Sequence, residues 1–533
     1  MSSFNLAELF ESVAATVPDR CAIASPGRRL TYRQLDERAS RLANHLSARG
    51  IGAGDHVGLY LLNGTEYLEA MLAAFKLRAV PININYRYVE RELEHLFDDA
   101  ELAALIFDAS FAERVASVAP GVSTLRHLMV VRGEVAGVVG YEPALAAASP
   151  HGHLEGRSGD DLYIAYTGGT TGMPKGVMWR HEDLFFAALG RGDPLLDKGP
   201  ITSPDELPGR IPDFPLAQLC APPLMHVSAH WGAFNTLFGG GKVVLLEPGR
   251  FDGDEVWRTV KSEGVNALTV VGDAMARPLL DTLASAPQGT YDTSTLLVFA
   301  SGGAILSGAT KSQIAEVLPN VIVIDAFGSS ETGIAGSRSA GAGEAGKGAR
   351  FTVDELTSVL DDDLRPVCPG SGQIGRLARR GHVPLGYFKD ETKTKATFVD
   401  VDGQRWVLPG DMATVDADGS VVVLGRGSGT INTGGEKVFP EEVEAVLKSH
   451  SSVFDVLVVG IPDDRWGESV AAVAQLRPGT DLNLEDLSAH ARTGMAGYKV
   501  PRQLFVVDEV RRGANGKPDY PWAKRLAAEG AGV

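Results

Sequence analysis

The sequence has only three cysteines, and they lie too far apart along the chain to act together. Cys21, Cys220 and Cys368 form neither the close spacing of a metal site nor the even-numbered framework of a disulfide-rich domain. Isolated thiols of this kind are typical of proteins in a reducing compartment. We therefore predict a cytoplasmic protein.

Long apolar segments and an excess of positive charge are also missing. No stretch reaches the length of a membrane-spanning helix, and the first residues lack the basic and apolar blocks of a signal peptide. The formal net charge is −17, so the surface is expected to repel nucleic acid and anionic membranes. We expect small-molecule partners instead, with a homodimer kept open as an alternative to a monomer.

Strand and helix patterns alternate through most of the chain. Residues 56–62, 79–85 and 102–108 are apolar runs that predict strands. Residues 65–77 have apolar positions at helical spacing and predict a helix. This alternation predicts an α/β fold with helices covering the sheets, and a chain of 533 residues is too long for one hydrophobic core.

The pattern changes near residue 428. Asp418-Gly419 lies between two β runs and predicts a hairpin, and a glycine-rich stretch follows. Pro440 and the two acids after it then predict the start of a helix, because proline fits the first turn and acids stabilise its positive end. The predicted domains are residues 1–427 and 428–533, the second a small α+β unit.

Two segments have the composition of surface loops. Residues 190–217 are rich in proline, glycine and aspartate, and residues 338–349 consist mainly of small and polar residues. Because loops usually run over the surface, we expect both segments to be surface excursions.

A loop rich in glycine and threonine, "YTGGTTGMPKGV", spans residues 166–177. A Walker A loop is excluded, because Pro174 stands where that motif has glycine and Gly176 follows Lys175. Glycines still let backbone N–H groups approach an anion, while threonine hydroxyls donate and lysine adds charge. A plain flexible turn is the alternative. The candidate phosphate ligands are Thr167, Gly168, Gly169, Thr170, Thr171, Gly172 and Lys175.

This loop resembles the signature loop of the adenylate-forming superfamily, which includes acyl-CoA synthetases, peptide-synthetase adenylation domains and luciferases. The family form is [YF]-T-S-G-T-T-G-x-P-K-G, and Gly168 here replaces its serine. In the family this loop grips the β- and γ-phosphates of ATP. The likeness runs from about residue 5 to 525. The amino-acid sequences of the motifs most resemble those of actinobacterial CoA ligases for fatty acids or steroid side-chain acids.

Further motifs follow in the order that the family has them. "SGGA" at residues 301–304 resembles the adenine-pocket turn, and "AFGSSETG" at 326–333 is similar to [YF]-G-x-[ST]-E. The resemblance implies that Phe327 stacks on adenine, that Ser330 contacts the α-phosphate and the substrate carboxylate, and that Glu331 helps to hold Mg²⁺. A hard carboxylate oxygen suits that cation. The implied nucleotide contacts in these two motifs are Gly302, Gly303, Ala304, Ala326, Phe327, Gly328 and Ser329.

The C-terminal motifs complete the set. "LPGDMA" places Asp411, and "GR" places Arg426, where the family binds the ribose. Gly434 and Gly435 match glycines that line the pantetheine tunnel, and Lys517 in "ANGKPDY" matches the catalytic lysine. The hinge position has Ser428 in place of the usual aspartate or lysine, with Gly429 after it.

The resemblance also implies a fold and a reaction. The large N-terminal domain would hold two β/α subdomains and a distorted β barrel, and the small C-terminal domain would be mobile. Such an enzyme uses ATP and Mg²⁺ to form an acyl-adenylate, releases pyrophosphate, and then transfers the acyl group to coenzyme A. An adenylating protein that loads another thiol, or that lacks thioesterification, is the alternative.

A hydrophobic acid is the expected substrate. Val227 stands where peptide-synthetase domains have an acid for an α-amine, and the chain ends soon after Lys517, so no fused carrier domain is expected. An apolar pocket without a fixed counter-charge suits a hydrophobic acid, although core packing would explain the same residues. The candidate substrate contacts are His226, His230, Trp231 and Met275.

Overall fold

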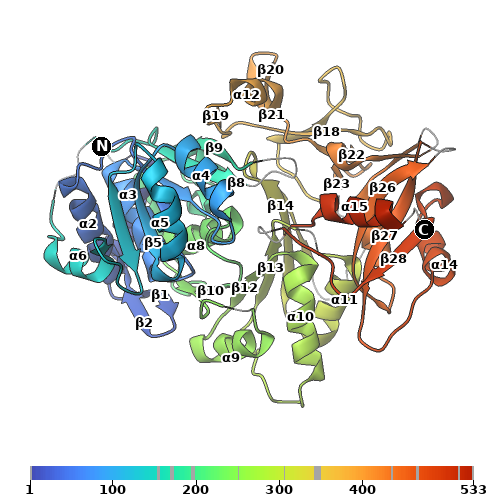
Figure 1. The fold of residues 1–533 in the computed structure, drawn as a ribbon, viewed down its shortest axis with the longest axis horizontal. Coiled ribbons are helices and arrows are strands. Elements are labelled where there is room, and N and C mark those ends of the chain that lie inside the picture. Colours follow the sequence, from blue (N-terminus) through green and yellow to red (C-terminus); the bar gives the residue numbers. More distant parts are fainter. Residues whose placement is uncertain are drawn as a thin grey trace.

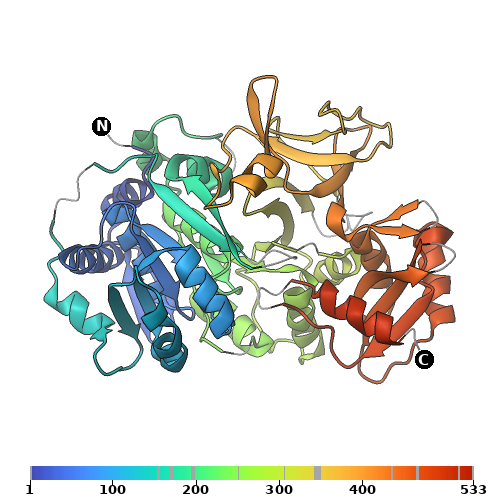
Figure 2. The ribbon, with the colours of Figure 1, turned by 45° about the horizontal axis from the view of Figure 1, so that its top comes forward.

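Four sheets make up the structure, which is a computed structural model (Figure 1). It describes residues 3–152, 156–167, 173–193, 198–249, 251–304, 306–340, 350–433, 436–463, 467–513 and 517–530. Two eight-stranded sheets form the N-terminal part, and a third sheet lies beside them. The C-terminal sheet lies at the opposite end of the molecule from the N-terminus (Figures 1 and 2). The expected α/β fold, with a large N-terminal and a small C-terminal domain, is confirmed.

Sheet 1 has the strand order β19-β9-β8-β4-β3-β5-β6-β7. Its strands are β3 (His56–Tyr60), β4 (Val80–Asn83), β5 (Leu102–Asp108), β6 (His127–Val131), β7 (Val139–Gly140), β8 (Leu162–Thr167), β9 (Lys175–Arg180) and β19 (Gly386–Tyr387). The helices in this part of the chain are α2 (Tyr32–Ala48), α3 (Thr65–Leu77), α4 (Glu90–Asp99), α5 (Ala112–Val118) and α6 (Tyr141–Ala147). The strands from β8 to β7 pair in parallel, whereas β8 and β9 form an antiparallel hairpin.

The core of sheet 1 explains why its sequence pattern was so clear. Every residue of β5 is buried, as a parallel strand covered on both faces requires. The helix α3 is almost entirely buried as well, and its one lysine, Lys76, forms ion pairs with Glu11 and with Asp36 at 2.8 Å. Because burial made their apolar patterns clear, β5 and α3 begin and end at the predicted residues.

Sheet 2 has the order β15-β14-β13-β12-β10-β11-β1-β2. Its strands are β1 (Cys21–Ser25), β2 (Arg28–Thr31), β10 (Ala217–Cys220), β11 (Lys242–Val244), β12 (Ala267–Val270), β13 (Val298–Gly302), β14 (Ile322–Ser329) and β15 (Gly333–Ala340). The remaining helices of the large domain, apart from α12, are α1 (Leu6–Thr16), α7 (His181–Ala188), α8 (Val227–Phe238), α9 (Gly253–Glu263), α10 (Gly272–Ser285) and α11 (Gly308–Val317). The neighbours β12, β13 and β14 run in parallel, so their carboxyl ends share one edge.

Sheet 3 is antiparallel and is formed by the part of the large domain for which a distorted β barrel was expected. Its strands are β16 (Arg350–Phe351), β17 (Thr357–Leu360), β18 (Gly375–Arg380), β20 (Phe398–Val401), β21 (Gln404–Val407), β22 (Asp411–Val415) and β23 (Val421–Arg426), and α12 (Glu391–Thr397) precedes β20. The predicted hairpin at Asp418-Gly419 joins β22 to β23, and Gly419 has a positive φ of 82°. Glycine adopts that conformation without strain.

Sheet 4 forms the small C-terminal domain. Its strands are β24 (Ile431–Thr433), β25 (Glu436–Val438), β26 (Val453–Asp463), β27 (Gly467–Leu476) and β28 (Gln503–Val507), with helices α13 (Pro440–Leu447), α14 (Leu484–Gly494) and α15 (Tyr520–Gly530). As predicted, Pro440 is the first residue of α13. The chain passes from sheet 3 to sheet 4 between Arg426 and Ile431; the proposed boundary between residues 427 and 428 stays a prediction.

The predicted surface loops are wrong in part. Within 190–217, Ile201 and Leu207 are each only 1% exposed, and a 3₁₀ turn forms over Pro204–Arg210. The start of 338–349 belongs to β15, which runs to Ala340, and residues 341–349 lie outside the described part of the chain. Among the helices of the described residues, none combines the length and apolar character that a membrane crossing needs.

Candidate active site

The predicted phosphate loop connects the two strands of the β8–β9 hairpin. Thr167 and Lys175 face each other as the last cross-strand pair, so the loop begins where the ladder ends. Lys175 is half-exposed and forms an ion pair with Asp390, the N-cap residue of α12. Of the predicted phosphate ligands, Gly168, Gly169, Thr170, Thr171 and Gly172 lie outside the described residues.

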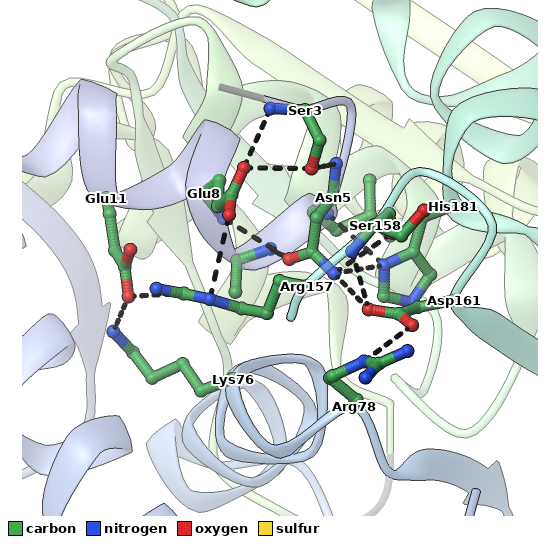
Figure 3. Close-up of polar contacts among 12 residues, drawn as sticks. Ser3, Asn5, Glu8, Glu11, Lys76, Arg78, Arg157, Ser158, Asp161 and His181 are labelled. Carbon is green, nitrogen blue, oxygen red and sulfur yellow. Dashed lines mark hydrogen bonds and ion pairs between the residues drawn. The ribbon is translucent and has the colours of Figure 1, made fainter. Parts of the chain in front are cut away.

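A polar network holds the other end of this hairpin (Figure 3). Asp161, just before β8, accepts from Asn5 Nδ2 at 2.9 Å and pairs with Arg78 Nε at 2.9 Å. His181, just after β9, accepts at Nδ1 from the backbone N–H of Leu6 at 3.3 Å. Burial lowers the pKa of His181 to about 4, so the ring is neutral and can accept. The start of α1 therefore fixes the base of the hairpin that carries the predicted phosphate loop.

The predicted adenine-side motifs meet at the carboxyl edge of sheet 2. Gly302 on β13 and Ala326 on β14 are paired in register, which places the "SGGA" turn beside "AFGSSETG". Gly303 has φ 87°, a conformation that favours glycine, and Ala304 O accepts from Ser301 Oγ at 2.9 Å. A Cβ added at Gly302 would meet no atom within 4 Å, so the space beside this turn is open.

The chain turns tightly between β14 and β15, and this turn presents Glu331. Gly328 approaches so closely that an added Cβ would lie 2.0 Å from Gly333 O. Ser329 Oγ accepts from the Glu331 backbone N–H at 3.2 Å, while Ser330 O accepts from Trp179 Nε1 at 2.9 Å. The hairpin strand β9 is thereby bonded to the turn. Phe327, just before it, is half-buried with its ring centroid 4.6 Å from that of Phe351.

Two residues of the site were missed by the sequence analysis. Tyr387 Oη donates to Glu331 Oε1 at 2.7 Å, and Lys393 Nζ lies 4.0 Å from the Tyr387 ring centroid. Burial lowers the pKa of Lys393, Lys175 and Arg426 lower it further, and Glu331 opposes them. The segment "GYFKDETKTK" carries both residues, and its aromatic and lysines beside a helix start were the available signal.

Asp411 and Arg426 are direct cross-strand partners on β22 and β23. Asp411 Oδ1 lies 3.0 Å from Arg426 Nε, and Arg426 Nη1 also donates to Pro409 O at 2.8 Å. Burial raises the pKa of Asp411, while Arg426 and Lys517 act against that rise. The two predicted ribose ligands are therefore held together on one face of sheet 3.

Lys517 reaches this group from the small domain. Its side chain keeps accessible surface, yet the surrounding protein removes part of its hydration, and this desolvation lowers the pKa of the ammonium. Arg426 lowers it further, whereas Glu331 and Asp411 raise it, so all three lie within electrostatic range. His226 also lies within that range, because Lys517 is one of the charges that act on it.

Cations that could face the phosphates of a nucleoside triphosphate lie around Lys517. They are Lys175, Lys393, Arg426 and Lys517 itself, and the carboxylates that interact with this group are Glu331, Asp390, Asp411 and Glu441. In the described part of the chain no three His, Cys, Asp or Glu side chains gather as a metal site. A Mg²⁺ ion at Glu331 would therefore take most of its oxygen ligands from phosphate and water.

The predicted substrate residues divide into two groups. His226 is the N-cap residue of α8 and Met275 lies in the first turn of α10; both are half-buried. Burial lowers the pKa of His226 to about 4, helped by Arg87 and Lys517, so its ring is neutral near pH 7. These two side chains remain candidates for the acyl site.

His230 and Trp231 belong to the interior instead. His230 is fully buried, and its ring nitrogens lie 2.5 Å from Tyr163 Oη and 2.8 Å from Leu224 O. Both polar atoms are thus used within the protein, and the prediction that His230 contacts substrate is wrong for this arrangement. Trp231 is 8% exposed and packs edge-on against Trp179 at 6.2 Å, which leaves little surface for a ligand.

Predicted coenzyme A contacts lie mostly beyond what the structure describes. Gly434 and Gly435 are outside the described residues. The hinge position falls in a 3₁₀ turn over Gly427–Gly429, between the last strand of sheet 3 and the first of sheet 4. The pantetheine tunnel and the movement at this hinge therefore stay predictions.

Glu441, the second residue of α13, meets the large domain beside this hinge. Its Oε1 is 3.5 Å from the Arg426 backbone N–H, and its Oε2 is buried with no hydrogen-bond partner among the described residues. Burial raises the pKa of this carboxyl to about 7, and the charge of Glu444 adds to the rise. The protonated form therefore predominates below about pH 7.

We expect Glu441→Gln to stabilise the protein at about pH 8 but not at about pH 5, because only the ionised carboxylate is penalised by burial. The folded chain holds this proton more tightly than the unfolded chain, so stability is lost as the pH rises toward the folded pKa of about 7. Melting temperatures across this pH range measure the effect. Glu442→Gln is the control, since Glu442 pairs with Lys499 and should show no gain that grows with pH.

Comparison with known proteins agrees with this geometry. Residues 10–388 match the family model described as AMP-binding enzyme, and residues 442–517 match the AMP-binding enzyme C-terminal domain. A 3-oxocholest-4-en-26-oate–CoA ligase of Rhodococcus rhodochrous is 48% identical, over 98% of this chain and 96% of its own length.

A second relative and a solved structure extend this comparison. A medium/long-chain-fatty-acid–CoA/3-oxocholest-4-en-26-oate–CoA ligase of Mycolicibacterium smegmatis (strain ATCC 700084 / mc(2)155) is 46% identical, over 99% of this chain and 97% of its own. The solved anthranilate CoA ligase AuaEII, in complex with anthranoyl-AMP, shares the fold with a TM-score of 0.86. It is 24% identical, and the match covers 99% of this chain and 98% of that one.

Proposed function

Because this chain belongs to the family of AMP-binding enzymes, we propose that it is an acyl-CoA ligase for a hydrophobic carboxylic acid. In the first half-reaction a carboxylate oxygen attacks the α-phosphorus of ATP, the bond to the bridging oxygen breaks, and pyrophosphate leaves. In the second, the thiolate of coenzyme A attacks the acyl carbon, and AMP leaves with the electron pair of the broken C–O bond.

The observation that carries this proposal is that Lys517, from the small domain, lies within electrostatic range of Asp411 and Glu331 of the large domain. Transfer of a nucleotidyl group spreads negative charge over the phosphate oxygens, and positioned cations stabilise that charge. Lys517 would supply such a cation between the acid and the α-phosphate, and Lys175 and Lys393 would face the outgoing phosphates. No general base is required, because the attacking carboxylate is already ionised.

Other residues of the site would hold the nucleotide. Asp411 and Arg426 would bind the ribose, Phe327 would pack on adenine, and Ser330 would contact the α-phosphate. A Mg²⁺ ion beside Glu331 would neutralise phosphate oxygens, and Tyr387 fixes the orientation of that carboxylate through its 2.7 Å hydrogen bond.

The acyl site would lie between α8 and the first turn of α10. A neutral His226 can donate a hydrogen bond to a carboxylate without adding a fixed charge, and Met275 offers a polarisable apolar surface. Both relatives are named for activating steroid side-chain acids, one of them also for fatty acids. We infer that the substrate is a medium- or long-chain fatty acid or a steroid side-chain acid.

A panel of carboxylic acids tests the proposal. With ATP, Mg²⁺ and coenzyme A, we expect a CoA thioester of a hydrophobic acid, together with AMP and pyrophosphate in equal amounts. Product mass identifies the preferred acid, and nucleotide analysis identifies the leaving group. Formation of ADP in amounts equal to the thioester would contradict the adenylate route.

The same panel distinguishes the alternative function. A protein that loads another thiol acceptor would catalyse acid-dependent exchange of pyrophosphate into ATP and yet form no CoA thioester. Acid-dependent exchange without thioester for every acid in the panel would support that alternative and reject the ligase proposal.

A further inference from the structure

Arg277 lies on α10 of the large domain, but its guanidinium binds the backbone of the small domain. Nη2 donates to Lys448 O at 2.9 Å, and Nη1 donates to Val453 O at 3.2 Å and also to Phe454 O. The side chain is 3% exposed, and Nε donates to Thr310 Oγ1 at 3.3 Å. Figures 1 and 2 both show α10 and α11 facing the small domain.

The backbone carbonyl groups that Arg277 binds lie at the end of α13 and the start of β26. Lys448 is the C-cap residue of α13, where carbonyl groups lack helical partners and carry partial negative charge. Val453 begins β26 close by, and the planar guanidinium spans both elements. When the domains dock, these backbone carbonyls replace the water that the guanidinium loses, so the charge-assisted bonds form only in the docked arrangement.

The carbonyl groups that Arg277 binds lie next in the chain to Asp455, which is linked through Arg512 to the segment around Lys517. Asp455, which follows Phe454, pairs with Lys448 Nζ at 3.1 Å and with Arg512. Arg512 is bridged to Pro518, and Gly513 N–H donates to Lys517 O at 2.8 Å. The start of β26 therefore binds Arg277 through its backbone, and through Asp455 it binds Arg512, whose neighbour Gly513 is hydrogen-bonded to Lys517.

The N-terminal end of α10, less than two turns before Arg277, borders the proposed acyl site. The backbone N–H of Gly272 donates to Ser301 Oγ at 3.0 Å, at the turn that contains Gly302 and Gly303. Asp273 accepts from Ser307 N–H at 2.9 Å and lies 3.5 Å from Arg277 Nε, one helical turn further on. Less than two turns of helix thus separate the acyl side from the interdomain contact.

We propose that Arg277 is a positioning residue that docks the small domain for the first half-reaction and so places Lys517 over the site. This inference rests on the proposed two-step function. Arg277 acts through the start of β26 and Asp455 and does not touch the reacting atoms. In the second half-reaction the small domain leaves this arrangement, and Arg277 is then not needed.

Measuring the half-reactions separately tests the proposal. Acid-dependent exchange of labelled pyrophosphate into ATP reports the first, and conversion of a synthetic acyl-adenylate to the CoA thioester reports the second. We expect Arg277→Met to slow exchange about tenfold to a hundredfold, the factor for losing one or two charge-assisted hydrogen bonds. The second half-reaction should stay near the wild-type rate, and Arg277→Lys, which keeps the charge, should recover part of the exchange.

Arg477→Met is the matched control at the same interface. Arg477 pairs with Asp281 across the two domains at 3.4 Å, but these side chains are 32% and 40% exposed, and exposed pairs contribute little. Both half-reactions should stay near wild type. Unchanged exchange in Arg277→Met, or equal loss of both half-reactions in Arg277→Met and Arg277→Lys, would overturn the proposal.

A structural measurement separates this inference from the proposed function. In small-angle X-ray scattering, the profile of Arg277→Met should shift from the docked arrangement more than that of Arg477→Met. This comparison is valid even if the wild-type chain activates no acid in the panel, a result that would reject the function alone. Identical scattering of wild type and both variants would reject the docking role of Arg277.

Discussion

Lys517→Ala is expected to slow acyl-adenylate formation about 10²–10³-fold, the usual cost of removing one preorganised donor from a developing charge. Its ammonium lies within range of Glu331, Asp411 and Arg426, and desolvation lowers its pKa without removing the partners that keep it charged. If the small domain moves as proposed, the same side chain would have no role in attack by the thiolate. A synthetic acyl-adenylate should therefore still be converted to acyl-CoA at nearly the wild-type rate.

Two assays measure this separation: acid-dependent pyrophosphate exchange, and thioester formation from the synthetic adenylate. Lys524→Ala provides a control on the same domain, because Lys524 is 55% exposed and forms an ion pair with Glu468. We expect it to leave both rates unchanged. Equal loss in both assays for Lys517→Ala would identify a structural lysine, and no loss in either would identify an ordinary surface charge.

Asp411→Ala is expected to raise the KM for ATP about tenfold or more, since one or two charge-assisted hydrogen bonds would be lost. The KM for the acid should change much less, because Asp411 lies on sheet 3, whereas the candidate acyl residues lie on α8 and α10. The substitution also leaves Arg426 without the carboxylate that now lies 3.0 Å from its Nε, so the second ribose ligand would be less well oriented. Steady-state kinetics with each substrate varied in turn measure both constants.

The turn of the same hairpin provides the control for Asp411. Asp418 is 63% exposed at the tip between β22 and β23, and Asp418→Ala removes an equal charge from the same element. We expect its KM for ATP to match the wild type. An unchanged KM for ATP in Asp411→Ala would remove this residue from the nucleotide site.

The sequence was most informative where a single pattern determined the structure. The strand β5 is buried on both faces and α3 is buried almost all round, so their apolar runs predicted their bounds closely. Prediction was poorer for residues 190–217, because turn-forming residues there surround Ile201 and Leu207, whose burial depends on distant elements. Composition reports the turns in such a segment but not the surface it packs against.

The site shows the same division. Motif order selected Asp411, Arg426 and Lys517 as candidates, and the docking of the two domains brings them within electrostatic range of one another. It did not separate His226 from His230, four residues later, because only the structure shows that Tyr163 and Leu224 use both nitrogens of His230. Nor did it reveal Arg277, whose acceptors are backbone carbonyls that leave no trace in composition. The cytoplasmic location and a homodimer stay predictions.

The ion pair between Lys175 and Asp390 means that the phosphate-loop lysine already has a negative partner before any nucleotide arrives. If Lys175 binds phosphate as proposed, the phosphate would replace one anion with another, and the net gain in free energy would be the difference between two attractions. Asp390 also accepts from the Lys393 backbone N–H at 2.9 Å and could keep its role as the cap of α12 without Lys175. Nucleotide affinity would then compete with the anchoring of α12 to the hairpin, and re-formation of the ion pair would favour the departure of pyrophosphate.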